Sequence, residues 1–486
     1  MTHASATARA TGQPDPATAL ARYASLVGDW DDFTAAMRRP APACVVANTS
    51  RLTASELAGL LCAENHGTVP VPWSPGALRC AGEARPGLWW PYRAGLYSVQ
   101  EEASLLPVAL LDPRPGERVL DLCAAPGGKT AQVCMALRNR GTVIANDRDS
   151  RRLAAVRDRM KRLGLLNLTT TAFDGRDYPL AAGPFDRVLV DAPCSAEGTN
   201  FRKGATFDGS SDGFRRRVTD QQRALLRRAV ALTRPGGRIV YSTCSLAPEE
   251  NEAVLDAILQ EDGSRVRVAP PPVDDAAFSP GIAEWEGRAF HPDVRHAIRL
   301  WPHISGTSGF FAVVLERIGP AETSQSTPVA ELGSALRHKE VLAAIGRRYG
   351  FPDDAFEGLA FAHRGDHVQA IASDHCPPAS PPPVASGVPF LRAEARIPKP
   401  TTAAAFLIGR QATRNVVELD RAQRDAYQTR QGFAPTPGQL AACDGHGYVI
   451  LRYRGQPLGV GLLRPGPPAR IDSQFPRAWV PRAHRT

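Results

Sequence analysis

The amino-acid sequence predicts an α/β protein built on a parallel β-sheet that carries helices on both faces. From residue 112 onward, short apolar stretches typical of strands alternate with amphipathic stretches typical of helices. Strands separated by helices need crossover connections, which produce a parallel sheet covered on both sides. Small polar residues and acids follow several of the apolar stretches, at the sheet edge where such proteins bind ligands.

The first of these units, Val119–Thr130 (VLDLCAAPGGKT), predicts a strand, a tight loop and the start of a helix. Backbone N–H groups and paired glycines allow such a loop to approach a bound cofactor closely. A nucleoside-triphosphate P-loop is excluded, because it needs glycine where this chain has Cys123. The dinucleotide motif G-x-G-x-x-G is also absent.

The remaining units follow in order. Further strands are expected at Thr142–Ala145, Leu168–Ala172, Arg187–Val190, Ile239–Ser242 and Gly309–Leu315. Helices are expected at about 150–163, at about 214–232 and from Pro248, with a turn at Pro235–Gly237. Asp147 follows the second strand, where an acid commonly binds ribose hydroxyls. Together with the glycine-rich loop, it favours a nucleoside cofactor over a capping or surface role.

Smaller units flank this core. Amphipathic helices are expected at about 17–38, and strands at Cys44–Ala47, Thr68–Trp73 and Gly95–Gln100. One further helix is expected to end at Gly67, and another to cover Glu101–Leu111. After a linker at Gly319–Thr327, the pattern predicts a helical segment at about 329–347, a Pro/Ser-rich linker at Cys376–Pro389, and a hairpin turning at Arg454–Gln456.

Bulk composition narrows the function classes. The 486 residues carry a net charge of +9, which is compatible with a polyanionic partner, although charge alone also fits any basic protein. No apolar run approaches the roughly 18–20 residues that span a membrane, and the N-terminal stretch lacks the core of a secretory signal. The nine cysteines form no C-x-x-C pair, which argues against a zinc cluster or disulfide framework and favours a reducing, cytoplasmic location. We therefore expect no metal.

Two of the cysteines stand apart from the others. Cys194 follows the fourth strand in Pro-Cys-Ser, and Cys244 follows the fifth strand in Thr-Cys-Ser. A single cysteine is usually a small buried hydrophobe, but two at strand ends in polar turns fit that explanation less well. A thiolate beside an acid points to covalent catalysis.

These segments resemble the RNA (cytosine-5)-methyltransferases of the Sun/Fmu (NSUN-like) family. The resemblance is carried by CAAPGGKT, by Asp191–Thr199 (DAPCSAEGT) and by Tyr241–Glu252 (YSTCSLAPEENE), in the family's order. FRKG after the second motif and Arg299–Leu315 (RLWPH…GFFAVVL) resemble its RsmF-like branch. The resemblance runs from about residue 20 to 317, and more weakly into the C-terminal domain.

The resemblance implies a Rossmann-like class I S-adenosylmethionine-dependent methyltransferase core. It implies five parts: a disordered arm (1–16), a small α/β N-terminal RNA-binding module (17–110), the catalytic domain (111–318), a linker with a helical segment (319–389) and a PUA-like RNA-binding domain (390–486). RNA is the expected partner, and the chain is expected to act as a monomer without contact to membranes.

The resemblance also implies the site and its chemistry. Cys244 adds to carbon-6 of cytosine and makes carbon-5 nucleophilic, Cys194 assists product release, and Asp191 contacts the cytosine edge near N3 with Lys129 close by. From the residues alone, the two cysteine roles could be exchanged. The residues expected to hold S-adenosylmethionine are Cys123, Ala124, Ala125, Pro126, Gly127, Gly128, Lys129, Asp147, Arg152, Asp174 and Asp191.

The chain departs from the family pattern at three places. Ala196 replaces the usual glycine after Pro-Cys-Ser, which is tolerated unless that position needs a positive φ angle. Val46 and Ala47 precede Asn48 where an arginine is usual, and Ser308 replaces an acid before the late Gly-Phe. These changes affect one expected RNA contact and one local match, not the catalytic set.

Three functions remain in competition. The leading hypothesis is cytosine-5 methylation of RNA, with small-subunit ribosomal RNA favoured over transfer RNA. A non-catalytic RNA-binding assembly factor is the second, although Cys194, Cys244 and Asp191 are all present. An amino-group methyltransferase is the third, but such enzymes tend to carry Asn/Asp-Pro-Pro-aromatic where this chain has Asp-Ala-Pro-Cys.

Overall fold

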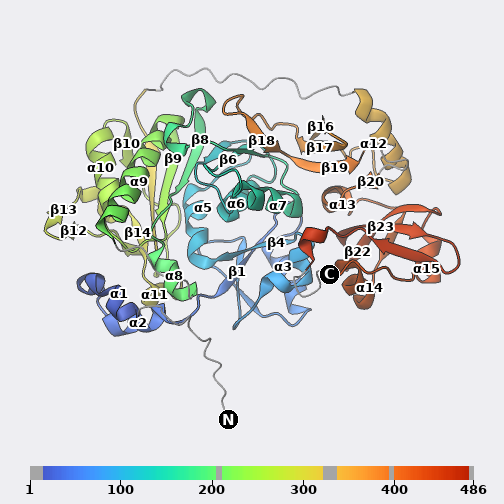
Figure 1. The fold of residues 1–486 in the computed structure, drawn as a ribbon, viewed down its shortest axis with the longest axis horizontal. Helices are drawn as coiled ribbons and strands as arrows, with labels where there is room; N and C mark the ends of the chain where they lie inside the picture. The colour runs from blue at the N-terminus through green and yellow to red at the C-terminus, as the bar shows by residue number, and fades with distance from the viewer. Residues whose placement is uncertain (1–14, 204–210, 321–335, 393–398, 481–486) are drawn as a thin grey trace, which may run out of the picture.

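The computed structural model describes residues 15–203, 211–320, 336–392 and 399–480 (Figure 1). Most of the predicted disordered arm and most of the linker predicted at Gly319–Thr327 lie outside these residues. None of the described helices is both long enough and apolar enough to cross a membrane.

A ten-stranded mixed sheet forms the centre of the molecule, in the order β11-β14-β15-β9-β8-β5-β6-β7-β18, with β10 also paired to β15. The parallel strands are β5 (Arg118–Asp121), β6 (Thr142–Asn146), β7 (Leu168–Thr171), β8 (Phe185–Asp191) and β9 (Thr233–Thr243). The antiparallel strands are β10 (Val266–Val268), β11 (Ser279–Pro280), β14 (Ile298–Leu300), β15 (Phe310–Arg317) and β18 (Pro383–Ser386). The six strands expected from the sequence are present. Five of them are parallel as predicted, whereas the sixth, β15, runs antiparallel to β9, so the sheet is mixed rather than parallel.

The turn predicted at Pro235–Gly237 is wrong, because these residues lie inside β9. The strand begins at Thr233, which pairs with Phe185, and the register with β8 shifts before Arg238 pairs with Arg187. Proline and glycine are accommodated where the ladder is irregular, as is usual for bulged strands.

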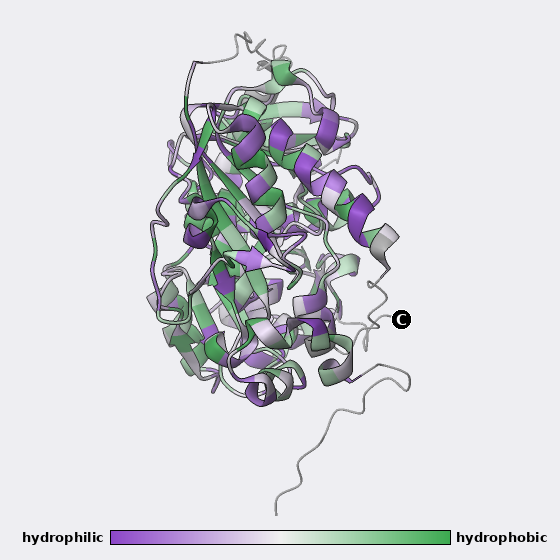
Figure 2. Ribbon diagram, turned by 90° about the vertical axis from the view of Figure 1, so that its left-hand side faces the viewer, coloured by the Kyte–Doolittle hydropathy of each residue, from purple (hydrophilic) through white to green (hydrophobic). Residues whose placement is uncertain are grey.

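Helices cover both faces of the sheet, as predicted. On one face lie α5 (Leu106–Leu111), α6 (Gly128–Ala136) and α7 (Leu153–Leu163), and on the other lie α9 (Asp212–Leu232) and α10 (Glu252–Asp262). Alternate strand residues enter two separate cores: Val119 packs on the α6 side and Leu120 on the α9 side. Figure 2 shows these hydrophobic strands running through the interior.

Short elements connect the larger ones around this sheet. They are η4 (Gly175–Asp177), η5 (Leu180–Ala182), α8 (Glu197–Lys203), β12 (Glu284–Trp285), β13 (Arg288–Ala289), η6 (Pro292–His296) and α11 (Pro302–Ser305). Of these, α8 matters most for the site, because it follows the loop that carries Cys194.

The region predicted as one N-terminal module, 17–110, divides into two packing units. The first comprises α1 (Pro16–Ala19), η1 (Ala21–Leu26) and α2 (Trp30–Met37). It packs on Leu246 and Trp301 of the catalytic core, and the Tyr23 hydroxyl donates to Glu197 Oε2 at 2.6 Å. These first helices therefore lie beside α8 and α11 (Figure 1).

The second unit is a four-stranded antiparallel sheet in the order β2-β3-β1-β4, with helix α3. Its elements are β1 (Ala43–Ala47), α3 (Ala54–Cys62), β2 (Thr68–Pro70), β3 (Ala77–Cys80), η2 (Pro86–Leu88), α4 (Trp90–Arg93), β4 (Tyr97–Glu101) and η3 (Glu102–Leu105). The strand at β1 and the strand near β4 were expected, whereas α3 ends at Cys62, before the predicted Gly67.

The C-terminal third contains two further four-stranded sheets, β16-β17-β19-β20 and β21-β22-β23-β24. The first comprises β16 (Leu359–Arg364), β17 (His367–Ala372), β19 (Val388–Arg392) and β20 (Lys399–Pro400), and follows α12 (Leu336–Tyr349). The second comprises β21 (Val416–Glu418), β22 (Gly447–Tyr453), β23 (Gln456–Arg464) and β24 (Arg470–Ser473), with α13 (Thr402–Ile408), α14 (Arg421–Gln428), α15 (Pro437–Ala441) and η7 (Arg477–Trp479). The hairpin predicted to turn at Arg454–Gln456 is confirmed, with Arg454 and Gly455 in the turn and Gln456 already in β23.

The linker predicted at Cys376–Pro389 is wrong in its second half. Residues Pro383–Ser386 form β18, which pairs with β7 and extends the central sheet. A proline is compatible with this position because Pro383 begins an edge strand. The C-terminal third also shares a core with the N-terminal sheet, in which Leu57 and Tyr97 belong with Tyr427 and Phe475. The PUA-like identity of this region stays a prediction.

Candidate active site

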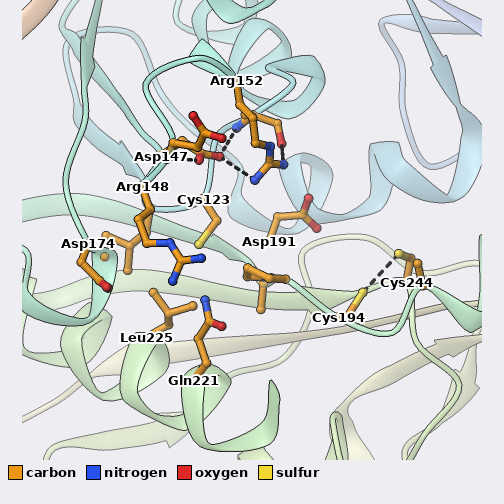
Figure 3. Close-up of a pocket in the computed structure, with 17 residues that line it drawn as sticks. Cys123, Asp147, Arg148, Arg152, Asp174, Asp191, Cys194, Gln221, Leu225 and Cys244 are labelled. Carbon is orange, nitrogen blue, oxygen red and sulfur yellow. Dashed lines mark hydrogen bonds and ion pairs between the residues drawn. The ribbon is translucent and has the colours of Figure 1, made fainter. Parts of the chain in front are cut away.

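The carboxyl ends of five parallel strands converge on a cavity of about 430 Å³ (Figure 3). Each predicted strand-end residue lines it: Cys123 after β5, Asp147 after β6, Asp174 after β7, Asp191 and Cys194 at the end of β8, and Cys244 after β9. The sheet order explains this meeting, because parallel neighbours end at the same edge. The prediction that these side chains gather at one site is confirmed.

The two thiols lie in contact at one end of this cavity. Cys194 Sγ and Cys244 Sγ are 3.3 Å apart, a hydrogen-bond distance between sulfur atoms (Figure 3). Because β8 and β9 are adjacent, the loops that leave them run side by side. The hydrogen bond from Cys194 lowers the pKa of Cys244, with a contribution from Thr199 and Lys129. The same bond, together with burial, raises the pKa of Cys194.

Lys129 and Asp191 form an ion pair beside the thiols. Lys129 Nζ lies 2.8 Å from Asp191 Oδ2, and Ser242 Oγ donates to Asp191 Oδ1 at 3.0 Å. Burial opposes the charge on Lys129, but the Asp191 carboxylate raises its pKa above the ordinary lysine value. The lysine therefore stays protonated, and the pair is fixed next to Cys244.

A second cavity of about 400 Å³ opens on the other side of the glycine-rich loop. It shares Cys123, Ala125, Asp191, Ala192 and Cys244 with the first cavity. Its remaining walls include Gln100 and Ser104 from the N-terminal sheet region, Arg159 from α7, Lys129, and Phe310 from β15. Cys244 and Asp191 thus stand where two cavities meet, with Cys194 on the side of the first cavity, as a reaction between two separately bound molecules requires.

The far end of the first cavity holds acids and arginines. Asp147 is 4% exposed and its Oδ1 accepts from the backbone N–H of Asp149 at 2.9 Å. Arg152 Nη1 lies 3.1 Å from Asp147 Oδ2, and Arg152 Nη2 donates to the Ala125 carbonyl at 2.9 Å. Asp174 pairs with Arg176, whose hydrogen bond lowers the pKa of Asp174.

Most residues of the glycine-rich loop line a cavity, and one residue shapes the loop instead. Ala124, Pro126 and Gly128 line the second cavity only. Gly127 lines neither cavity; it is the N-cap of α6 with φ 91°, where a side chain is strained and a Cβ would lie 3.1 Å from Val156. Ten of the eleven predicted cofactor residues thus line a cavity, and Gly127 shapes the loop.

Sequence reasoning missed several residues that line the two cavities. They are Asp121, Arg148, Asp149, Gly175, Thr199, Gln221, Leu225 and Phe310. Asp121 had a signal, since an acid inside the apolar strand VLDL is unusual. It is 1% exposed, burial raises its pKa to about 7, and Thr130 donates to its Oδ2 at 2.6 Å. The others come from helices and loops whose approach depends on tertiary packing.

Glu250 is a further missed residue, and it joins the two cysteine loops. The carboxylate is fully buried, and its Oε2 accepts from the Ser195 backbone N–H at 3.0 Å and from Gln222 Nε2 at 2.9 Å. Its Oε1 accepts from Ser245 Oγ at 2.7 Å, and the Ser195 and Ser245 hydroxyls are 2.9 Å apart. One carboxylate therefore holds the residue after each cysteine.

Ala196 occupies the position where the family pattern has glycine, and its φ angle is 58°. A left-handed conformation costs a residue with a Cβ about 1–2 kcal/mol. The positive φ angle that makes alanine less favourable than glycine is therefore present at this position, and the Cys194 loop carries local strain.

Parts of the chain are similar in sequence to known methyltransferases. Residues 108–316 match the family model described as 16S rRNA methyltransferase RsmB/F. A 28S rRNA (cytosine-C(5))-methyltransferase of Mus musculus is 34% identical over 310 residues, which cover 63% of this chain and 38% of that protein. The chain therefore spans less than half the length of this relative.

A second relative matches over nearly its whole length. The tRNA (cytosine(49)-C(5))-methyltransferase of Pyrococcus abyssi is 33% identical over 301 residues, which cover 61% of this chain and 94% of that protein. The crystal structure of a methyltransferase homolog protein from Pyrococcus horikoshii superposes with a TM-score of 0.56 at 31% identity, covering 62% of this chain and 95% of that one.

Proposed function

The chain belongs to the RNA (cytosine-C5)-methyltransferases, and we propose that it transfers a methyl group from S-adenosylmethionine to carbon-5 of a cytosine in RNA. The observation that carries the proposal is the contact between Cys194 and Cys244, 3.3 Å apart, beside the Lys129–Asp191 pair. Two thiols with opposite pKa shifts suit a reaction in which one sulfur bonds the base and another aids its release.

The residues present fit S-adenosylmethionine. The first cavity offers the buried Asp147 carboxylate to ribose hydroxyls, and Leu122 and Leu225 to the apolar face of adenine. Gly175 keeps this cavity open, since a Cβ there would lie 2.7 Å from Leu225. In the second cavity, the buried Oδ1 of Asp121 has no hydrogen-bond partner among the described residues, which suits an ammonium group. When bound, the cofactor supplies an electrophilic methyl group.

Cys244 is the nucleophile in the proposed mechanism. Its lowered pKa favours the thiolate, which adds to carbon-6 of cytosine and moves an electron pair toward carbon-5. Asp191, held by Lys129 and Ser242, is positioned to contact the cytosine edge near N3 and to stabilise the charge that develops on the ring.

Cys194 acts at the end of the reaction. After methyl transfer, a base removes the carbon-5 proton while the bond between carbon-6 and Cys244 Sγ breaks. The Cys194 thiol, whose pKa is raised, donates a hydrogen bond to the departing thiolate. A sulfur with a lower pKa leaves faster, so this hydrogen bond assists release of the product.

The target base must leave its helix to reach this site. Cys244 lines both cavities and Cys194 lines the first, whereas a cytosine inside a duplex has the face of its ring covered by stacking, so a thiolate cannot reach carbon-6 there. The second cavity, with Phe310 and Lys129 in its walls, is large enough to receive a flipped or single-stranded nucleotide.

Ribosomal RNA is the substrate we favour, because the matched family model is described as a 16S rRNA methyltransferase. Transfer RNA is the second candidate, because the relative that matches over 94% of its length acts on tRNA by its name. The cytoplasmic location, the monomeric state and the RNA-binding roles of the terminal domains stay predictions.

The test is incubation of the purified chain with tritiated S-adenosylmethionine and either transcribed small-subunit ribosomal RNA or transfer RNA. Digestion to nucleosides should place the label in 5-methylcytidine. Label in N4-methylcytidine or in methyladenosine, or no label in any nucleoside, would overturn the proposal. Bisulfite mapping of RNA from a deletion strain then identifies the cytosine, and unchanged ribosomal cytosines would rule out that substrate.

A further inference from the structure

A groove of about 420 Å³ lies away from the active site, between α7 and the first sheet of the C-terminal third. Its charged lining residues are Arg157 and Lys161 from α7 and Arg364 from β16, and no acid lines it. Arg157 and Lys161 stand four residues apart and so share one face of the helix. The groove is therefore a concave surface of one charge sign.

The wall of the groove opposite α7 is hydrogen-bonded to the catalytic core. It contains Ser386 and Gly387, and Ser386 Oγ lies 2.8 Å from Thr169 Oγ1 of β7. Nearby, Asp374 Oδ2 accepts from the Gly141 backbone N–H at 2.8 Å, and His375 Nε2 lies 2.7 Å from Thr169 Oγ1. The pairing of β18 with β7 thus places Ser386 and Gly387 in the wall of the groove and fixes them to the central sheet.

The three cations of this groove have no acidic partner among the described residues. Arg157 Nη1 is enclosed and lacks any hydrogen-bond partner, and Arg364 Nη2 donates only to the Val384 carbonyl at 2.8 Å. Arg157 is half-buried, and burying part of a cation without an anion is unfavourable, whereas Lys161 and Arg364 are exposed and available to a ligand. An anionic ligand held between the three would satisfy Arg157 and pair with the other two.

A second basic groove, of about 590 Å³, differs because most of its arginines have acidic partners. It is lined by Arg227, Arg228 and Arg265 with Arg176, but acids neutralise most of them. Arg227 pairs with Glu261, and Arg265 Nη1 lies 3.4 Å from Asp262 Oδ1. Net positive charge alone thus does not distinguish the first groove; the lack of acidic partners does.

We propose that the groove of Arg157, Lys161 and Arg364 binds backbone phosphates of the substrate RNA. The inference rests on the proposed function, because RNA is the polyanion that this chain must hold. Helix α7 also carries Arg159, which lines the second cavity and stands two residues after Arg157, about 3 Å further along the helix axis. An RNA strand that delivers a nucleotide to the site can therefore extend along α7 into the groove.

The test compares two triple variants of the full chain. Arg157→Gln/Lys161→Gln/Arg364→Gln removes the unpaired cations, and Arg227→Gln/Arg228→Gln/Arg265→Gln is the matched control in the second groove. The probe is a fluorescein-labelled single-stranded RNA of 25 nucleotides, whose Kd is measured by anisotropy over a salt series. Losing three phosphate contacts should weaken binding on the order of tenfold or more and reduce the salt slope by about 2.

The control variant should keep a salt slope within about 0.5 of the unmodified chain, because Arg227 and Arg265 pair with acids and Arg228 Nε donates to the Arg176 carbonyl. Affinity for S-adenosylhomocysteine, measured by calorimetry, should be unchanged in both variants and shows that each is folded. An unchanged RNA slope in the first variant, or an equal loss in both, would overturn the inference. Because RNA binding is read without methylation, a chain that binds RNA but modifies no cytosine would refute the proposed function alone.

Discussion

The loop after β8 and the loop after β9 look alike in the sequence but differ in electrostatics. Each carries a cysteine followed by serine, and the two sulfurs touch. The hydrogen bond between the two sulfurs lowers the pKa of Cys244, with Thr199 and Lys129 contributing, whereas the same bond, burial and the charge of Glu250 raise the pKa of Cys194. The hydrogen bond between the two sulfurs, together with unequal neighbouring groups, therefore separates two thiols of the same residue type.

Lys129→Met should have the largest effect on this division. The substitution removes a cation that favours the Cys244 thiolate and leaves Asp191 without its 2.8 Å partner. We expect kcat/KM to fall by about 10²–10³-fold, in the range seen when one stabilising donor is lost. Steady-state methylation assays measure this. Lys129→Arg keeps the charge and should lose less; equal losses in both variants would mean that charge is not what the lysine supplies.

Glu250→Gln should loosen the two loops relative to each other. The amide nitrogen would replace either Oε2, which accepts from the Ser195 N–H and from Gln222, or Oε1, where the Ser245 hydroxyl would have to accept instead of donate. Either placement disturbs the network and removes the negative charge. We expect turnover to fall by roughly 10-fold or more. We also expect a covalent RNA adduct to accumulate, because Cys194 no longer supports release.

Glu252→Gln is the matched control for this variant. Glu252 is equally buried but pairs with Arg299, at 2.6 Å, and touches neither cysteine. Breaking this buried ion pair should cost about 3–5 kcal/mol of the free energy of unfolding, seen in thermal melts, without adduct accumulation. Adduct accumulation in Glu252→Gln, or none in Glu250→Gln, would assign Glu250 a purely structural role.

The pH dependence of adduct formation should separate the two sulfurs. The thiolate form of Cys244 reacts, so the rate rises with pH through its pKa, which lies below the ordinary thiol value of 9.0. Cys194→Ala removes the hydrogen bond that lowers this pKa, and the midpoint should move to higher pH. Cys194→Ser keeps a donor and should move it less. Single-turnover rates across pH 6–10 provide the measurement, and a midpoint unchanged in Cys194→Ala would contradict the assigned cause.

Ala196→Gly should have the smallest effect. Glycine relieves the strain at φ 58° but adds entropy to the unfolded chain, so the net gain in stability is about 1 kcal/mol or less. Ala192→Gly, in the same loop at a position without a positive φ, should instead lose about 0.5–1 kcal/mol. Chemical denaturation measures both, and equal losses would show that Ala196 carries no strain.

The sequence predicted those parts of the site that follow from the order of the strands. Strand ends are visible as apolar stretches followed by polar residues, and adjacent parallel strands bring Cys194 and Cys244 to one edge. It could not predict which thiol has the lower pKa, because that depends on the hydrogen bond between the two sulfurs and on Thr199 and Lys129, which come from other elements. Glu250 likewise needed the packed loops to show its three partners.

The flanking regions were less predictable for a different reason. Pro383 and its neighbours carry the composition of a linker, and only the exposed edge of β7 makes them a strand. The helices before Met37 were expected to belong to the N-terminal module, but Trp301 and Leu246 form a larger apolar surface for them. The surface against which such a segment packs depends on the tertiary structure, and local sequence patterns do not reveal it.

The most direct test of the division of roles is a trapping experiment with RNA that contains 5-azacytidine, followed by denaturing gels and peptide mass spectrometry. The unmodified chain and Cys194→Ala should form a covalent RNA adduct, with the cross-link on Cys244, and Cys244→Ala should form none. An adduct in Cys244→Ala, or a cross-link mapped to Cys194, would contradict the account and exchange the roles of the two sulfurs.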